Sequence, residues 1–116
     1  MQTITQPAES PEFARRAPAT AYVLRTTARV PLLPEGPRLA LFAVAALADN
    51  ALYSNYGYEG HLASEVAAVT GRTLLKTKQA LTRLEKLGML EFGGQGSASN
   101  PLYKIPQAAF DYANEV

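Results

Sequence analysis

The side chains best suited to chemistry lie on one predicted helix, from Leu74 to Gly88. At about 100° per residue, Leu84 marks the centre of an apolar face. The opposite face carries polar and basic groups and one apolar residue, Leu75. Its polar members are Lys78, Gln79, Thr82 and Lys86, with Lys76 and Arg83 at the border. Lys and Arg neutralise phosphates, and Gln and Thr can form hydrogen bonds with base edges. The pattern therefore favours contact with nucleic acid, while the periodicity alone is equally compatible with an ordinary solvated face.

Positive charge is concentrated around this helix. Residues 71–104 contain six Lys or Arg against two Glu, a net charge of +4, whereas the remainder contains five Lys or Arg against eight Asp or Glu, a net charge of −3. A protein that binds nucleic acid needs such a local excess. The expected contact set is Arg72, Thr73, Lys76, Lys78, Gln79, Thr82, Arg83, Lys86 and Lys104. Within this set, Lys78 and Gln79 are expected nearest the base edges, and Arg83 and Lys86 nearer phosphate.

A second predicted helix and its turn position the first. Its apolar residues recur at helical spacing and would pack on one side: Leu62, Val66 and Val69. Gly71 would end this helix, because glycine tolerates the left-handed conformation of a helix cap. Thr73 could cap the next helix, and Gly88 would stop it.

A predicted hairpin follows. Met89 to Phe92 and Leu102 to Ile105 are short enough to be its two strands. The connection from Gly93 to Asn100 is rich in glycine and small polar residues, as expected of a flexible tip. Pro106 would end the second strand, and Gln107 to Asn114 can form one or two helical turns.

The first 36 residues have a different character. Residues 1–19, rich in proline and without apolar periodicity, predict a mobile tail. Residues 20–36 predict an N-terminal arm, in which Tyr22 to Val30 alternates with the period of two that is typical of a strand. Arg25 and Arg29 would share one face of it. Packing of this strand on the domain or on a partner subunit is favoured over contact of a basic arm with phosphate or the minor groove.

A helix that starts near Pro37 would be apolar on all sides. Covering it requires the Tyr22–Val30 segment, the C-terminal segment or a second subunit, and a homodimer is expected because DNA readers commonly bind two half-sites. The stretch from Asp49 to Gly60 could supply a short strand that pairs with the hairpin. Its tyrosines are expected to pack at the core edge rather than stack on unpaired bases: Tyr53, Tyr56 and Tyr58.

The order and spacing of these elements resemble a winged helix-turn-helix. The residues that stand at the spacing of bacterial winged-helix regulators are Val66-Ala67, Thr70-Gly71, Leu84-Glu85 and Gly88-Met89-Leu90. The run from Gly93 to Ile105 is similar to the wing of modules in phage and plasmid replication proteins and related small regulators. The sequence departs from that family at Leu62, where a capping Ser or Thr is usual.

The resemblance implies an α+β fold that is mainly α. A three-helix core with a C-terminal β-hairpin wing would occupy residues 37–106, preceded by an N-terminal extension and followed by a short C-terminal helix at residues 107–116. It also implies binding of double-stranded DNA, with the recognition helix at residues 74–87 in the major groove and the wing at residues 89–105 beside it.

The sequence lacks the residue sets of common catalysts. It contains one histidine, His61, and no cysteine, so thiolate chemistry is excluded and a conventional zinc site is not expected. Metalloprotease, Walker-type and nucleophile-elbow motifs are missing, so neither enzymatic activity nor a cofactor is expected. The longest apolar run, Leu39 to Ala48, is too short for a bilayer, and the N-terminus lacks a signal-peptide pattern. No membrane contact and a cytoplasmic location are therefore expected.

Two functions are left open by the sequence. One is a sequence-specific DNA-binding protein, acting as a regulator of transcription or replication. The other is a winged helix that serves as a protein–protein adaptor, which an apolar Leu75 on the polar face, the low net charge and the uncharged wing tip favour. The local basic excess favours DNA.

Overall fold

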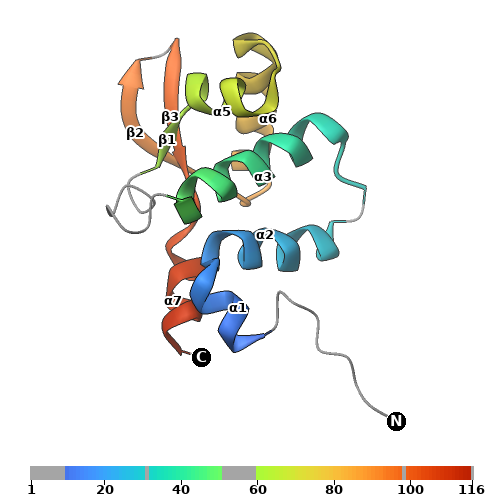
Figure 1. Ribbon diagram of the computed structural model, residues 1–116. Coiled ribbons are helices and arrows are strands. Elements are labelled where there is room, and N and C mark those ends of the chain that lie inside the picture. Colours follow the sequence, from blue (N-terminus) through green and yellow to red (C-terminus); the bar gives the residue numbers. More distant parts are fainter. Residues whose placement is uncertain (1–9, 31, 51–59, 98, 116) are drawn as a thin grey trace.

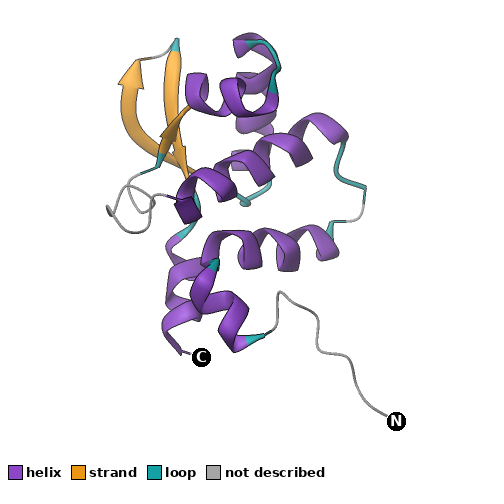
Figure 2. Ribbon diagram, in the orientation of Figure 1, coloured by secondary structure: helices purple, strands orange, loops and turns teal. Residues whose placement is uncertain are grey.

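The long helix α3 lies at the centre of the structure, between two layers (Figure 1). The computed structural model describes residues 10–30, 32–50, 60–97 and 99–115. Its elements are α1 (Pro11–Arg16), α2 (Pro18–Arg29), α3 (Glu35–Asn50), β1 (His61–Leu62), α5 (Ala63–Thr70), α6 (Leu74–Lys86), β2 (Glu91–Ser97), β3 (Asn100–Lys104) and α7 (Gln107–Glu115). One layer holds α5, α6 and the sheet, and the other holds α2, backed by α1 and α7. The expected α+β class, mainly helical, is confirmed (Figure 2).

The strands form a three-stranded antiparallel sheet with β3 in the middle. The β2–β3 pairing runs from Glu91 opposite Lys104 to Ser97 opposite Asn100. The predicted hairpin is therefore confirmed, but its strands are shifted toward the tip: they extend into the Gly93–Asn100 stretch, and they leave out Met89, Leu90 and Ile105. The predicted C-terminal helical turns are also present, as α7.

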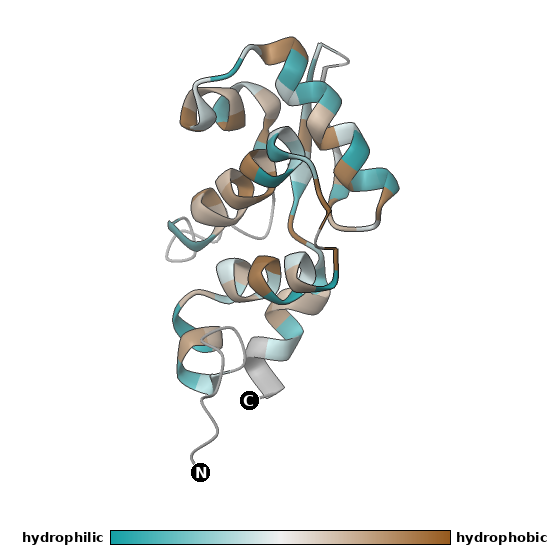
Figure 3. Cartoon of the chain, turned by 90° about the vertical axis from the view of Figure 1, so that its right-hand side faces the viewer, coloured by the Kyte–Doolittle hydropathy of each residue, from teal (hydrophilic) through white to brown (hydrophobic). Residues whose placement is uncertain are grey.

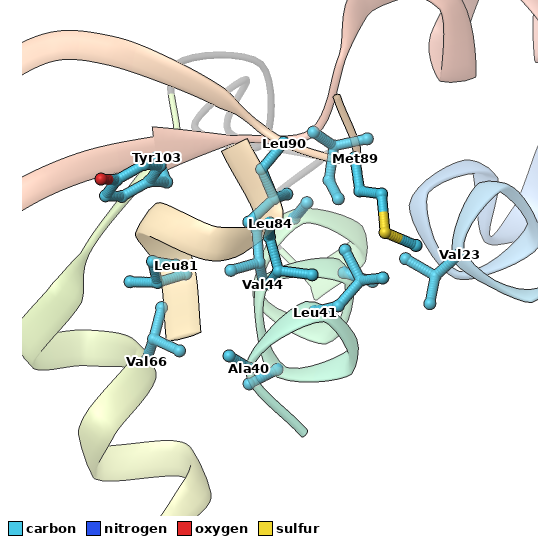
Figure 4. Close-up of a cluster of buried hydrophobic side chains, with 14 of the residues drawn as sticks. Val23, Ala40, Leu41, Val44, Val66, Leu81, Leu84, Met89, Leu90 and Tyr103 are labelled. Atoms are coloured by element: carbon cyan, nitrogen blue, oxygen red, sulfur yellow. The ribbon is translucent and has the colours of Figure 1, made fainter. Parts of the chain in front are cut away.

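Helix α3 is buried along most of its length because its small side chains allow neighbours to approach closely. Its buried residues are Pro37, Ala40, Leu41, Ala43, Val44, Ala45 and Ala48. Helix α6 packs on one face of α3 and α2 on another. Figure 4 shows this core, in which Met89 extends toward Val23 of α2. The Tyr22–Val30 segment thus covers α3, as expected, and Pro37 lies in the first turn of α3, as expected.

The prediction that Tyr22 to Val30 forms a strand is wrong, because these residues lie in helix α2 or at its C-terminal cap. Pro18 occupies the first turn of α2, where its missing N–H costs nothing. Ala17, at the N-cap position, offers no side-chain acceptor, so the usual local signal of a helix start is missing. The carboxylate of Asp49, at the far end of α3, accepts hydrogen bonds from the N–H groups of Ala19 and Thr20, both at 2.9 Å. A contact distant in sequence therefore caps α2.

The prediction of a mobile tail over residues 1–19 is wrong for residues 11–16, which form α1, and for Pro18 and Ala19. Ser10 caps α1, its hydroxyl accepting a hydrogen bond from the N–H of Phe13 at 3.4 Å. The first nine residues lie outside the described part of the chain. Tyr53, Tyr56 and Tyr58 also lie outside it.

Tyr22 connects α2 to the loop between α6 and β2. Its hydroxyl donates a hydrogen bond to the carbonyl oxygen of Met89 at 3.2 Å. Burial raises the pKa of the Tyr22 phenol above its ordinary value. The Tyr22 bond links α2 in one layer to the loop that leads into the sheet in the other.

Thr77 provides a first test of how the core is packed. It lies on the buried side of α6, is 2% exposed, and its hydroxyl has no hydrogen-bond partner among the described residues. Thr77→Val keeps the shape and removes an unsatisfied buried hydroxyl, so we expect it to raise the free energy of unfolding by about 1 kcal/mol. Thr73→Val, the same change at the cap of the same helix, is expected to lower it by about 1 kcal/mol. Urea unfolding measures both, and a destabilised Thr77→Val would contradict the packing described.

Candidate nucleic-acid interface

Gly71 and Thr73 build the turn between α5 and α6, and Gly88 lies just beyond the far end of α6, all three in roles that the sequence predicts. Gly71 has a φ of 74° and its N–H donates to the carbonyl oxygen of Ala67 at 2.8 Å, which ends α5. The hydroxyl of Thr73 accepts from the N–H of Lys76 at 3.2 Å, which caps α6. Gly88 has a φ of 76° and follows the end of α6. All three predictions are confirmed: Gly71 and Thr73 define the turn from which α6 leaves, and Gly88 marks where α6 ends.

Helix α6 packs through the face centred on Leu84, as predicted. Its buried residues are Thr77, Ala80, Leu81 and Leu84. Leu74 and Leu87, at the two ends of the predicted apolar face, are 38% and 49% exposed. On α5, Val66 is buried but Val69 is 53% exposed, so the prediction that Val69 packs inward is wrong. Helix α5 has only eight residues, and Ala63 and Val66 supply its buried contact.

One flank of α6 faces the start of α3 and gathers positive charge. A hollow of about 300 Å³ lies there. Its lining from the turn and α6 consists of Arg72, Lys76, Gln79, Ala80 and Arg83, and its lining from the first turn of α3 consists of Gly36 and Pro37. We call this site the α3–α6 hollow. Lys76, Gln79 and Arg83 are exposed, and Arg72 is half-buried. The guanidinium of Arg72 lies over Gly36, with Nη1 3.0 Å from the position that a Cβ would take there. A larger residue at this point of α3 would push Arg72 aside.

The other flank of α6 faces the sheet. The hydroxyl of Thr82 lies 3.4 Å from the phenol oxygen of Tyr103 on β3, although Thr82 itself stays exposed. Lys78, one turn earlier on the same flank, is half-buried. Lys86 is exposed near the end of the helix. The predicted polar face is therefore divided into a cationic flank toward α3 and a flank on which Thr82 reaches the sheet. Figure 3 shows hydrophilic and hydrophobic residues alternating along the helices.

Lys104 does not join the other predicted contact residues at the hollow. It lies at the base of the hairpin, opposite Glu91, and its amino group is 3.9 Å from the Glu91 carboxylate. Lys104, the one cation predicted on the hairpin, is therefore paired with an acidic neighbour at the end of the strands opposite the tip.

The hairpin is attached to the start of α5 by a pair of hydrogen bonds. The Asn100 Oδ1 atom accepts from the N–H of Ser64 at 2.9 Å, and its Nδ2 donates to the Ser64 hydroxyl at 3.0 Å. Leu62, at the N-cap of α5, has no acceptor, so Asn100 supplies the missing cap from the hairpin. Glu65 completes the cap by accepting from the N–H of Leu62 at 2.9 Å. In the sequence, a leucine at the N-cap position indicates that the acceptor for the first N–H groups of α5 must come from another part of the chain.

This cap gives a second test. Asn100→Ala removes both hydrogen bonds to Ser64, and we expect the free energy of unfolding to fall by about 1 kcal/mol, the usual cost of a lost helix cap. Asn100→Asp keeps the acceptor and adds negative charge at a helix N-terminus, where it is favourable. It is expected to retain the stability of the parent protein in urea unfolding. Equal losses in both variants would show that the cap contributes little.

The start of α3 is the part of the hollow that sequence reasoning missed. Gly36 and Pro37 are about half a chain away from Arg83 in sequence, and nothing local marks them as neighbours of basic residues. Only the packing of α3 against α6 brings them together.

His61 is the one histidine of the chain, and it lies in β1. His61 is buried, with Nδ1 3.7 Å from a carboxylate oxygen of Glu65 and Nε2 without a hydrogen-bond partner. Among the residues that the structure describes, no three His, Cys, Asp or Glu side chains form a group that could hold a metal ion. No helix in the same part of the chain has the length and apolar character needed to cross a membrane.

Comparison of the chain with models of protein families, with curated proteins and with solved structures found no match.

Proposed function

We propose that this chain is a winged helix-turn-helix protein that binds double-stranded DNA in a sequence-specific manner. Helix α6 would enter the major groove, and the β2–β3 hairpin would lie against the flanking groove or backbone. The observation that carries the proposal is the α3–α6 hollow, where Arg72, Lys76 and Arg83 surround one open space beside Gln79.

The proposed roles follow from where each side chain lies. The major groove of B-DNA is wide enough to admit an α-helix, so the exposed side of α6 could enter it. Gln79 would address base edges from it, because an amide can donate and accept hydrogen bonds at the same time. The three cations around the hollow would hold the phosphates of the flanking strand, since basic side chains at a groove edge position a protein on the duplex. Lys86 would extend this contact beyond the hollow.

The proposed biological role is regulation of transcription or replication in the cytoplasm, by a homodimer on paired half-sites. A second copy would dock on the hollow between α2 and α3, which is lined by apolar and polar residues: Leu24, Thr27, Ala28, Arg38 and Phe42. Sedimentation of the protein alone tests this part of the proposal, and a monomer at all concentrations would overturn it.

A fluorescence-anisotropy titration against mixed-sequence duplex, repeated across a salt series, tests DNA binding directly. The logarithm of affinity is expected to fall linearly with the logarithm of salt concentration, by about 0.9 for each phosphate contacted. Absence of binding at low salt would overturn the proposal.

The alternative function is that of a protein–protein adaptor. The exposure of Leu75, at 64%, and of Val69, at 53%, favours it, because large apolar side chains in water often mark a protein contact. Both functions predict that Leu75 is covered in a complex, but only DNA binding predicts the salt dependence.

A further inference from the structure

Leu75 lies on the part of α6 that is furthest from the core. At about 100° per residue, it shares this ridge with Gln79, Thr82 and Lys86, opposite the buried Leu84 face. Leu75 is the second residue of α6 and is 64% exposed. Residues near the start of a recognition helix are those that contact base edges. Leu75 is thus the apolar member of a ridge that is otherwise polar.

The charge around Leu75 indicates what covers it. Lys76 and Lys78 follow it closely in the first turns of α6, and Arg83 and Lys86 lie further along, against a single acidic residue of this helix, Glu85. A polyanion complements this surface. An apolar protein pocket would instead have to bring several lysine and arginine side chains out of water at its rim.

Within the major groove, only thymine presents an apolar group, its 5-methyl. We propose that Leu75 contacts a thymine methyl and so determines part of the sequence preference of this protein, an inference that rests on the proposed DNA binding. Gln79, one turn later, would read an adenine by the paired hydrogen bonds that glutamine forms with that base. The two residues are about 6 Å apart along the helix axis, at about 1.5 Å per residue, so the thymine and the adenine would lie within roughly two base-pair steps.

The test uses the full chain and a duplex that it selects from a random pool. Each thymine of the selected site is replaced in turn by deoxyuridine, which removes only the 5-methyl group, and affinity is measured by anisotropy. At one position the parent protein is expected to lose about fourfold in affinity, which corresponds to about 0.8 kcal/mol for one buried carbon. Leu75→Ala is expected to bind the thymine and uracil duplexes equally well.

Leu87→Ala is the matched control, because it makes the same deletion at another exposed leucine, at the C-terminal end of α6. It is expected to keep the fourfold preference for thymine. A thymine preference that persists in Leu75→Ala, as it would if Leu75 docked a protein instead, overturns the assignment. A selected site without thymine, or no uracil effect at any position, also overturns it. In each of these cases duplex binding by the parent protein would still support the proposed function, whereas absence of duplex binding would remove both.

Discussion

Combining Arg72→Ala, Lys76→Ala and Arg83→Ala is expected to weaken duplex DNA binding by on the order of a hundredfold at fixed salt. Three solvent-exposed ion pairs with phosphate, at about 1 kcal/mol each, correspond to about two factors of ten in affinity. The slope of log affinity against log salt is also expected to become shallower by about 3, because each lost phosphate contact removes about 0.9. The three side chains line one hollow, so they are expected to act on one stretch of backbone.

The matched control removes the same charge from the opposite layer of the molecule. Arg15→Ala, Arg16→Ala and Arg29→Ala change α1 and α2, which lie across α3 from α6 (Figure 1). This control is expected to leave the salt slope within about one phosphate contact of the parent value. If it weakened binding as much as the first triple variant, net charge rather than the α3–α6 hollow would hold the DNA. Thermal unfolding of each variant separates a loss of contact from a loss of fold.

The features of this chain that could be predicted from its sequence are those determined within about one helical turn. Gly71, Thr73 and Gly88 act on backbone groups no more than four residues away. The buried face of α6 follows from helical periodicity, which is also a local property. The position of the hairpin follows in the same way from short apolar runs and the glycines between them.

The features that the sequence did not reveal depend on contacts between distant residues. At Tyr22 to Val30, nine alternating residues were too few to distinguish a strand from a helix. The cap that would have marked the start of α2 comes from Asp49, which is distant in sequence. The α3–α6 hollow depends on Gly36 meeting Arg72, and the fixing of the hairpin depends on Asn100 meeting Ser64. Helix α1 is the exception, since Ser10 and Pro11 were a local start signal that the proline-rich composition obscured.

Asp49→Ala is expected to have the largest effect on stability among the variants considered, lowering the free energy of unfolding by about 3 kcal/mol. The Asp49 carboxylate accepts three hydrogen bonds at the start of α2, from the N–H of Ala19, the N–H of Thr20 and the Thr20 hydroxyl, the last at 2.6 Å. Asp49 lies near the C-terminus of α3, where the α3 dipole disfavours negative charge. Its position is favourable only because the N-terminus of α2 meets it there.

The same contact joins α2 to the central helix α3, so its loss is expected to loosen α2 from α3 as well as to remove a cap. Hydrogen exchange gives the specific readout: the amides of Ala19 and Thr20 are expected to exchange faster in Asp49→Ala than in the parent protein, because both lose their acceptor. Asp111→Ala, which removes an exposed carboxylate from α7, is expected to change stability by less than about 0.5 kcal/mol. If Asp49→Ala unfolded at the same urea concentration as Asp111→Ala, α2 would be held by its apolar face alone, and Asp49 would be incidental to the packing of α2 on α3.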